Sequence, residues 1–240
     1  MRKAKLIESR TLSPSVRSLT LRMTDGLALG HKAGQYVDLV VPTAGGLPHR
    51  RSYSIASSPD PTDPDVFEIA VTRVEGGPTS EALHALSLGV LVEVEGPLGT
   101  FVRRADEGQH PALFVATGTG LAPFRAMLSE ELRGKPPRPG PPLVLLFGCR
   151  TPSDVLWGDD LRGWEVAHPR FRLVVTLSRP APEWTGLTGY VQRHARALAD
   201  SLRDPRAYVC GLSAMVDDVV ALLERDARMS PASVRAETYD

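Results

Sequence analysis

The decapeptide RRSYSIASSP at positions 50–59 combines a phosphate-binding residue type with small hydroxyl side chains. On a strand, alternation would place Tyr53 on one face and Ser52 and Ser54 on the other, beside the cation of Arg51. Small hydroxyl residues leave room for a flat molecule and offer it hydrogen bonds, and an arginine fork matches a phosphate. Taken alone, the stretch fits either a ligand-binding strand or an ordinary edge strand of a β domain.

A second candidate is FVATGTGLAPFRAML at 114–128, where an apolar strand runs through a glycine turn into a predicted helix. Glycines let a backbone approach a ligand closely, and a helix N-terminus favours a pyrophosphate. The stretch is not GxGxxG and lacks the lysine of a P-loop, which argues against kinase or ATPase chemistry. The alternative is a plain strand–helix connection.

A third candidate is EGGPTSEALHAL at 75–86, in which Thr79 or Ser80 could cap a helix behind two glycines. This is either a simple N-cap or, together with Arg51, a second anion site. Two anion sites fit two dinucleotides, or one dinucleotide and a separate nucleotide.

Composition excludes several classes of function. The chain has 240 residues with 28 Lys+Arg against 28 Asp+Glu, so no net field would recruit nucleic acid or an anionic membrane. No apolar run approaches the ~20 residues of a membrane span. Cys149 and Cys210 provide neither a disulfide framework nor CxxC spacing. We expect a cytoplasmic protein without a metal site.

The elements that must position these candidates change character along the chain. The first hundred residues contain six short strand-like runs separated by turn signals, at 4–9, 16–23, 34–42, 50–57, 67–74 and 91–97. One helix is predicted among them, at 79–89, with Gly89 as its stop. This pattern predicts an antiparallel barrel or sandwich over residues 1–105.

From about residue 111, continuous apolar strands alternate with helical patterns. The strands are expected at 112–118, 143–149, 172–178 and 207–211, with helices that include 122–134 and 213–228. Such alternation predicts a parallel sheet wrapped by helices, over 106–240. The polar stretch 103–110 is predicted to be the linker between the two domains, and the proline-rich stretch 134–142 a surface connection between a helix and a strand.

The motifs also occur in the order found in a known family. They are RSYS (51–54), GPTS (77–80), ATGTGLAPFR (116–125), LFGCRTPSDVLW (146–157), LSRP (177–180), GYVQ (189–192), YVCGLSAM (208–215) and the closing ETYD. In this respect the whole chain resembles the plant-type ferredoxin/flavodoxin–NADP(+) reductase family. The resemblance implies an N-terminal Greek-key β-barrel that binds FAD and a C-terminal doubly wound α/β domain that binds NAD(P).

The resemblance assigns the first half to the flavin. It implies that Arg51 pairs with the FAD pyrophosphate, that Tyr53 packs against the flavin, and that Ser54 lies near N5, the hydride acceptor. Further cofactor contacts are expected from Ser52 on the same strand, from Val71, Thr72 and Arg73 on a lining strand, and from Gly77, Thr79 and Ser80 in the pyrophosphate loop.

The second half is assigned to the nicotinamide nucleotide. The resemblance places Thr117, Gly118, Thr119, Gly120 and Pro123 along it, Cys210 and Gly211 beside the nicotinamide, and Ser178, Arg179, Tyr190 and Gln192 at its adenosine end. An inert, packed Cys210 is the alternative. Glu237 would deliver a proton, stabilise the nicotinamide or remain a solvated carboxylate, and Tyr239 would stack on the flavin. Ser54, Cys210 and Glu237 are the catalytic candidates.

The implied activity is hydride transfer from NADPH to FAD, with electrons passed to ferredoxin, flavodoxin or an oxygenase component. NADPH is expected over NADH because Ser178 and Arg179 could read the 2′-phosphate, although Thr188 replaces a lysine frequent in NADPH-using members. The alternatives are a free flavin or ferric reductase, a diaphorase, and an electron-transfer subunit that acts only within a complex.

Overall fold

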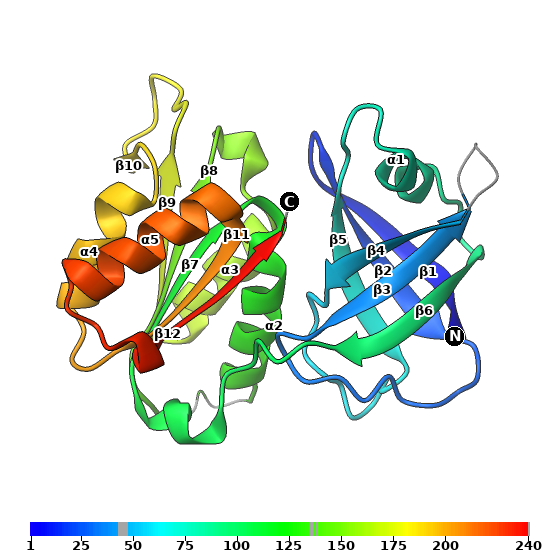
Figure 1. Ribbon diagram of the computed structural model, residues 1–240, viewed down its shortest axis with the longest axis horizontal. Coiled ribbons are helices and arrows are strands. Elements are labelled where there is room, and N and C mark those ends of the chain that lie inside the picture. The colour runs from blue at the N-terminus through cyan, green and yellow to red at the C-terminus, as the bar shows by residue number, and fades with distance from the viewer. Residues whose placement is uncertain (43–47, 135–136, 138, 240) are drawn as a thin grey trace. The chain divides into compact units, whose positions relative to one another are not determined.

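The computed structural model describes residues 1–42, 48–134, 137 and 139–239 (Figure 1). Its contacts divide into two compact units, Met1–Val102 with Ala122–Glu131, and Arg103–Leu121 with Leu132–Asp240. The sequence-based boundary between residues 105 and 106 stays a prediction. Lys135, Pro136 and Arg138 of the predicted surface connection lie outside the described residues.

The first unit contains an antiparallel sheet. Its strands are β1 (Arg2–Ser13), β2 (Val16–Met23), β3 (Tyr36–Pro42), β4 (Pro48–Ser54), β5 (Val66–Thr72) and β6 (Leu91–Leu98), in the order β4-β3-β6-β1-β2-β5. Both edge strands meet, because Ile55 bridges to Ile69 and the amide of Ala56 donates to the carbonyl of Glu68. The predicted antiparallel Greek-key barrel is confirmed.

Alternating side chains fill the barrel. Leu19 and Leu21 of β2 are buried with Leu39 of β3 and with Phe67 and Ile69 of β5. Helix α1 (Pro78–His84) packs its Leu83 into the same core. The helix is shorter than the predicted 79–89, because the chain turns after His84 so that Gly89 can donate its amide to Leu6 and enter β6.

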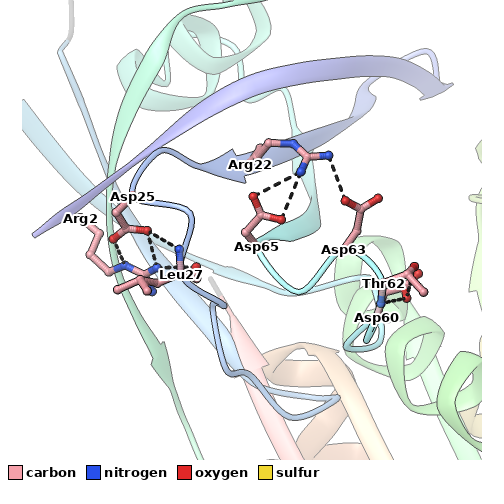
Figure 2. A network of polar contacts seen from close by, with 8 residues as sticks. All are labelled: Arg2, Arg22, Asp25, Leu27, Asp60, Thr62, Asp63 and Asp65. Atoms are coloured by element: carbon pink, nitrogen blue, oxygen red, sulfur yellow. Dashed lines mark hydrogen bonds and ion pairs between the residues drawn. The ribbon is translucent and has the colours of Figure 1, made fainter.

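Several arginines of this unit are committed to carboxylates (Figure 2). Arg2 forms a two-pronged pair with Asp25 at 2.8 Å, which lowers the pKa of Asp25 to about 2. Arg22 spans Asp63 and Asp65, each at 3.2 Å. These cations are therefore neutralised within the barrel's own loops.

Helix α2 (Leu121–Glu131) contributes residues 122–131 to the first unit. Arg125 donates from Nη1 to the carbonyl of Ala56 at 2.9 Å and to the Glu68 carboxylate at 2.8 Å. Glu68 also accepts a hydrogen bond from Ser18. Both charged side chains are mostly buried, so the pair is a fixed part of this unit, and losing one partner would leave a buried charge.

The second unit contains a parallel sheet. Its strands are β7 (Ala112–Thr117), β8 (Leu143–Cys149), β9 (Phe171–Leu177), β10 (Leu187–Thr188), β11 (Arg206–Leu212) and β12 (Val234–Tyr239), in the order β10-β9-β8-β7-β11-β12. Its helices are α3 (Gly158–Ala167), α4 (Gln192–Asp200) and α5 (Ser213–Arg225). The strand order reverses between β7 and β11, so the predicted doubly wound fold is confirmed.

Helices cover both faces of this sheet. Residues of α4 and α5, among them Leu198 and Val219, form one buried core with strand residues such as Val115 and Val209. Figure 1 shows these two helices in front of the sheet and α3 behind it. In such sheets, ligands bind at the carboxyl ends of the strands beside the reversal of strand order, which here is the edge that carries the glycine turn after β7.

The predicted linker is anchored through a buried carboxylate. Glu107 is 6% exposed and accepts hydrogen bonds from the Arg104 amide at 2.8 Å, the Tyr208 hydroxyl at 2.9 Å and the Arg235 guanidinium at 2.9 Å. Burial raises the pKa of Glu107, but these donors outweigh it and the net pKa is lowered. The polar stretch 103–110 is thus fastened to the first residues of β11 and β12.

Candidate cofactor sites

On β4, the side chains that share a face with Arg51 differ from those that the sequence predicted. Arg51 pairs with Leu39 and Tyr53 with Val37, so Arg51 lies on the same face as Tyr53 and not beside Ser52. The reason is the two-residue period of a strand, which separates Arg51 from both neighbouring serines. Arginine and tyrosine therefore form one candidate surface.

The opposite face of β4 is partly occupied by its own network. Ser52 donates to Asp38 at 2.6 Å, and Arg50 pairs with Asp38 at 3.3 Å and Glu95 at 2.6 Å. The Ser52 hydroxyl is thus already engaged. Ser54 lies two residues along, half-buried, and its hydroxyl has no hydrogen-bond partner within the described part of the chain.

Arg51 is exposed and, among the described residues, has no carboxylate partner, in contrast to Arg2, Arg22 and Arg50. Burial raises the pKa of Tyr53 to about 12, and the nearby Arg51 cation opposes that rise. A free guanidinium beside an aromatic ring suits a phosphate next to a planar ring system. These residues fit FAD.

The GPTS loop is held in shape by hydrogen bonds between its own residues and those just before it. Gly77 is the N-cap of α1, so neither Thr79 nor Ser80 caps the helix as the sequence suggested. Instead, the Ser80 hydroxyl accepts from the Val74 amide at 3.1 Å and lies 3.0 Å from the Gly77 carbonyl, because a residue in the first turn can reach back to the loop. Thr79 is buried.

At the carboxyl end of β5, the three residues predicted to line the flavin cofactor differ in exposure. Val71 is buried in the barrel core, whereas Thr72 and Arg73 are exposed. The Arg73 guanidinium has no partner in the part of the chain that the structure describes. A second cation is therefore available to an anion in this unit.

In the second unit, the glycine turn after β7 can pack closely against the end of β11. Gly118 has φ +54°, a left-handed conformation that favours glycine. A Cβ on Gly120 would overlap the carbonyl oxygen of Cys210, because the turn lies directly against the end of β11. The structure thus brings together the turn and the Cys210-Gly211 segment.

Thr117 leaves one polar atom unsatisfied in this region. Its Oγ1 is buried and has no hydrogen-bond partner among the described residues. A Cβ on Gly211 would overlap this oxygen and the Met215 side chain. An orphaned hydroxyl at the carboxyl edge, next to the exposed Gly118, fits a polar ligand such as a nicotinamide nucleotide. Thr119 is half-buried, and Pro123, at the start of α2, is buried.

Cys210 and Glu237 are register neighbours on β11 and β12. Cys210 is fully buried, and burial, followed by the charge of Glu237, raises the pKa of its thiol. Burial also raises the pKa of Glu237 to about 7. The pair therefore holds a neutral thiol beside a carboxyl group that can take up or release a proton near neutral pH.

The predicted adenosine-end residues follow β9 and β10. Arg179 is exposed and Ser178 half-buried, Tyr190 is 66% exposed, and Gln192 donates to Asp218 at 3.1 Å. Arg150 was not among the adenosine-end residues predicted from the sequence, although its carbonyl accepts the Arg179 amide at 2.8 Å. Its position directly after β8, in the GCR of a quoted motif, was the available signal.

Neither a metal-binding group of side chains nor a membrane-spanning helix is found in the described residues. No group of three or more His, Cys, Asp or Glu side chains there could hold a metal ion. No helix in the same ranges is long and apolar enough to cross a bilayer.

Two family models match the chain. The Oxidoreductase FAD-binding domain matches residues 3–102, and the Oxidoreductase NAD-binding domain matches residues 114–221. The first match covers β4 and the GPTS loop, and the second covers the glycine turn and the segment around Cys210.

Curated relatives agree with these models. Ferredoxin--NADP reductase B of Sorangium cellulosum is 43% identical over 99% of this chain and 97% of its own length. The reductase subunit of an aromatic O-demethylase from Amycolatopsis is 34% identical over 98% of this chain and 68% of its own. This chain spans 58 to 68% of the length of that subunit and of the phenol hydroxylase and dioxygenase reductase components it also matches.

Solved structures share the fold. The crystal structure of an Amycolatopsis cytochrome P450 reductase superposes with a TM-score of 0.82 at 31% identity, over 99% of this chain and 70% of that one. The ferredoxin reductase of a carbazole 1,9a-dioxygenase gives 0.84 at 22% identity, over 100% and 69%. With the matching family models and the 43% identical relative, these similarities establish that the chain belongs to the ferredoxin–NADP reductase-like family of FAD-dependent NAD(P)H oxidoreductases.

Proposed function

We propose that the protein oxidises NADPH through bound FAD and reduces a small electron carrier, either a ferredoxin or flavodoxin or the component of an oxygenase. The observation that carries this proposal is the 43% identity to a ferredoxin–NADP reductase over nearly the full length of both chains. The oxygenase-reductase relatives support the second class of acceptor.

Bound FAD supplies hydride acceptance at its N5 atom and the release of electrons one at a time. In the first unit, Arg51 would neutralise the cofactor's pyrophosphate and Tyr53 would pack against its ring system. Ser54, whose hydroxyl has no partner in the described residues, would donate a hydrogen bond at N5. Ser80 contributes indirectly, by holding the loop ahead of α1 in shape.

In the second unit, the exposed backbone of Gly118 would contact the nicotinamide nucleotide, and the Thr117 hydroxyl would gain a partner from it. The buried Cys210 thiol stays protonated at neutral pH, so it would contact the nicotinamide ring without acting as a nucleophile. Glu237, with a pKa of about 7, would hold or release a proton next to that ring.

NADPH is the preferred nucleotide in this proposal. Arg150 and Arg179 are joined through their backbones, and both guanidinium groups are exposed without a carboxylate partner among the described residues. Two free cations that follow neighbouring strands suit the dianionic 2′-phosphate, which NADH lacks. The cytoplasmic location belongs to the same proposal, since two free cysteines fit a reducing compartment.

The test uses the purified, FAD-reconstituted protein under anaerobic conditions. We expect a flavin absorption band that bleaches with NADPH, and kcat/KM at least tenfold higher for NADPH than for NADH. Arg179→Ala should lose about tenfold with NADPH and little with NADH, in line with one charge-assisted contact. Arg172→Ala, an exposed arginine on β9, is the matched control.

The acceptor class is then tested by steady-state reduction. We expect ferredoxin or flavodoxin to be reduced faster than ferricyanide or free flavins at equal concentration. The opposite ranking would favour the diaphorase or free flavin reductase alternative, and failure to retain FAD would remove the proposal.

A further inference from the structure

Tyr239 ends β12 and makes a contact that its expected stacking role does not involve. Its hydroxyl donates to the Thr117 carbonyl at 2.7 Å and accepts from the Gly120 amide at 3.0 Å. These two backbone groups flank the glycine turn after β7, so a single hydroxyl closes the turn from one end to the other.

The fold explains how a residue of β12 reaches that turn. β11 lies between β7 and β12, and Tyr239 is in register with Leu212 at the carboxyl end of β11. A Cβ on Gly118 would lie 3.1 Å from the Tyr239 oxygen. Because Gly118 has no side chain, the hydroxyl can sit against the turn.

The two hydrogen bonds have an energetic consequence for the turn. The tyrosine is half-buried, and burial raises the pKa of its hydroxyl, so the proton needed for the bond to Thr117 is retained at neutral pH. Without the hydroxyl, the Gly120 amide and the Thr117 carbonyl would lose their partner at the edge of a buried strand. Gly118, at φ +54°, would then be free to leave that conformation.

We propose that the Tyr239 hydroxyl is a positioning group that holds the turn Gly118–Gly120 in the conformation that receives the nicotinamide nucleotide. The inference rests on the proposed function, since it takes this turn as part of the nucleotide site. It differs from ring stacking, because it assigns the effect to the hydroxyl rather than to the aromatic face.

The test separates hydroxyl from ring and the turn from the rest of the nucleotide site. Dissociation constants for NADP+ and for 2′-phospho-AMP are measured by calorimetry on the FAD-loaded wild type and on Tyr239→Phe, which retains the ring. 2′-Phospho-AMP carries the adenosine end but has neither nicotinamide nor pyrophosphate. We expect the NADP+ constant to rise about tenfold and the 2′-phospho-AMP constant to stay within about twofold.

Tyr208→Phe is the matched control. Tyr208 is a buried tyrosine of the same unit whose hydroxyl donates to Glu107 at 2.9 Å, near the opposite end of β11. Its loss should lower the melting temperature without changing the ratio of the two dissociation constants. Amide hydrogen exchange at 117–121 provides a second readout and should become faster in Tyr239→Phe only.

An unchanged NADP+ constant in Tyr239→Phe would overturn the inference, as would a tighter NADP+ complex. Equal weakening of both ligands, with exchange at 117–121 unchanged, would reduce Tyr239 to a structural residue and also overturn it. A wild type that binds FAD but neither nucleotide would instead contradict the proposed function, so the two failures are distinguishable.

Discussion

The two units present their candidate ligand groups in different ways. In the barrel these groups are side chains, namely the free Arg51 cation, the ring of Tyr53 and the Ser54 hydroxyl. In the parallel sheet, the candidate site centres on the backbone of Gly118 and Gly120, where an added Cβ would meet Tyr239 or Cys210. The barrel site should therefore respond to the removal of side-chain groups, and the sheet site to their addition.

The largest expected effect comes from adding one methyl group to the sheet site. Gly120→Ala would place a Cβ against the Cys210 carbonyl, where only backbone can move. We expect a loss of about 3 kcal/mol in the free energy of unfolding and at least tenfold weaker NADP+ binding. Chemical denaturation and calorimetry measure both.

The control for Gly120→Ala is Gly163→Ala on α3, where nothing lies within 4 Å of the added Cβ. That change should stabilise by about 0.5–1 kcal/mol, since alanine favours a helix. If the two variants had similar free energies of unfolding and similar NADP+ affinities, the sheet site would not depend on the close packing of the turn against β11.

The next effect tests the barrel site by deletion. Arg51→Ala should weaken FAD binding by about one to two decades, because a charge-assisted hydrogen bond to phosphate contributes roughly 1.5–3 kcal/mol. The release of FAD is followed by its fluorescence. Arg50→Gln, on the opposite face of β4, should cost stability through Asp38 and Glu95 but retain the flavin.

Glu237 should add a pH dependence to the stability of the sheet unit. Its folded pKa of about 7 lies above its ordinary 4.5, so its contribution is fully present below pH 4.5 and is lost as the pH rises through 7. Glu237→Gln should gain about 2 kcal/mol over wild type at pH 8, and little at pH 4. Urea unfolding across this range measures the difference, with the exposed Glu183→Gln as control.

The smallest expected effect distinguishes two serines on one face of β4. Ser54→Ala should retain FAD but slow its reduction by NADPH by about threefold to tenfold, because one hydrogen bond at the reacting atom is lost. Stopped-flow bleaching of the flavin band records the rate. Ser52→Ala removes the bond to Asp38 and should act on stability instead. Identical reduction rates in wild type and Ser54→Ala would leave Ser54 a packing residue.

Local sequence was sufficient for the architecture. Turn residues between short alternating runs predicted an antiparallel barrel or sandwich, and continuous apolar runs followed by helices predicted the parallel sheet, because strand periodicity and burial are local properties. The helix after Pro78 was predicted too long, since its end depends on the long-range pairing of Gly89 with Leu6.

The sequence alone determined which residue types are present at each candidate site, including Arg51, Gly120 and Cys210. Only the tertiary structure decided which groups remain available. It committed Ser52 to Asp38 and Arg50 to Glu95, brought Arg150 to Arg179, and joined the Tyr239 hydroxyl to a turn about 120 residues earlier in the chain. The physical reason is that hydrogen bonds and ion pairs depend on distance in space, which strand order sets and which spacing along the chain does not reveal.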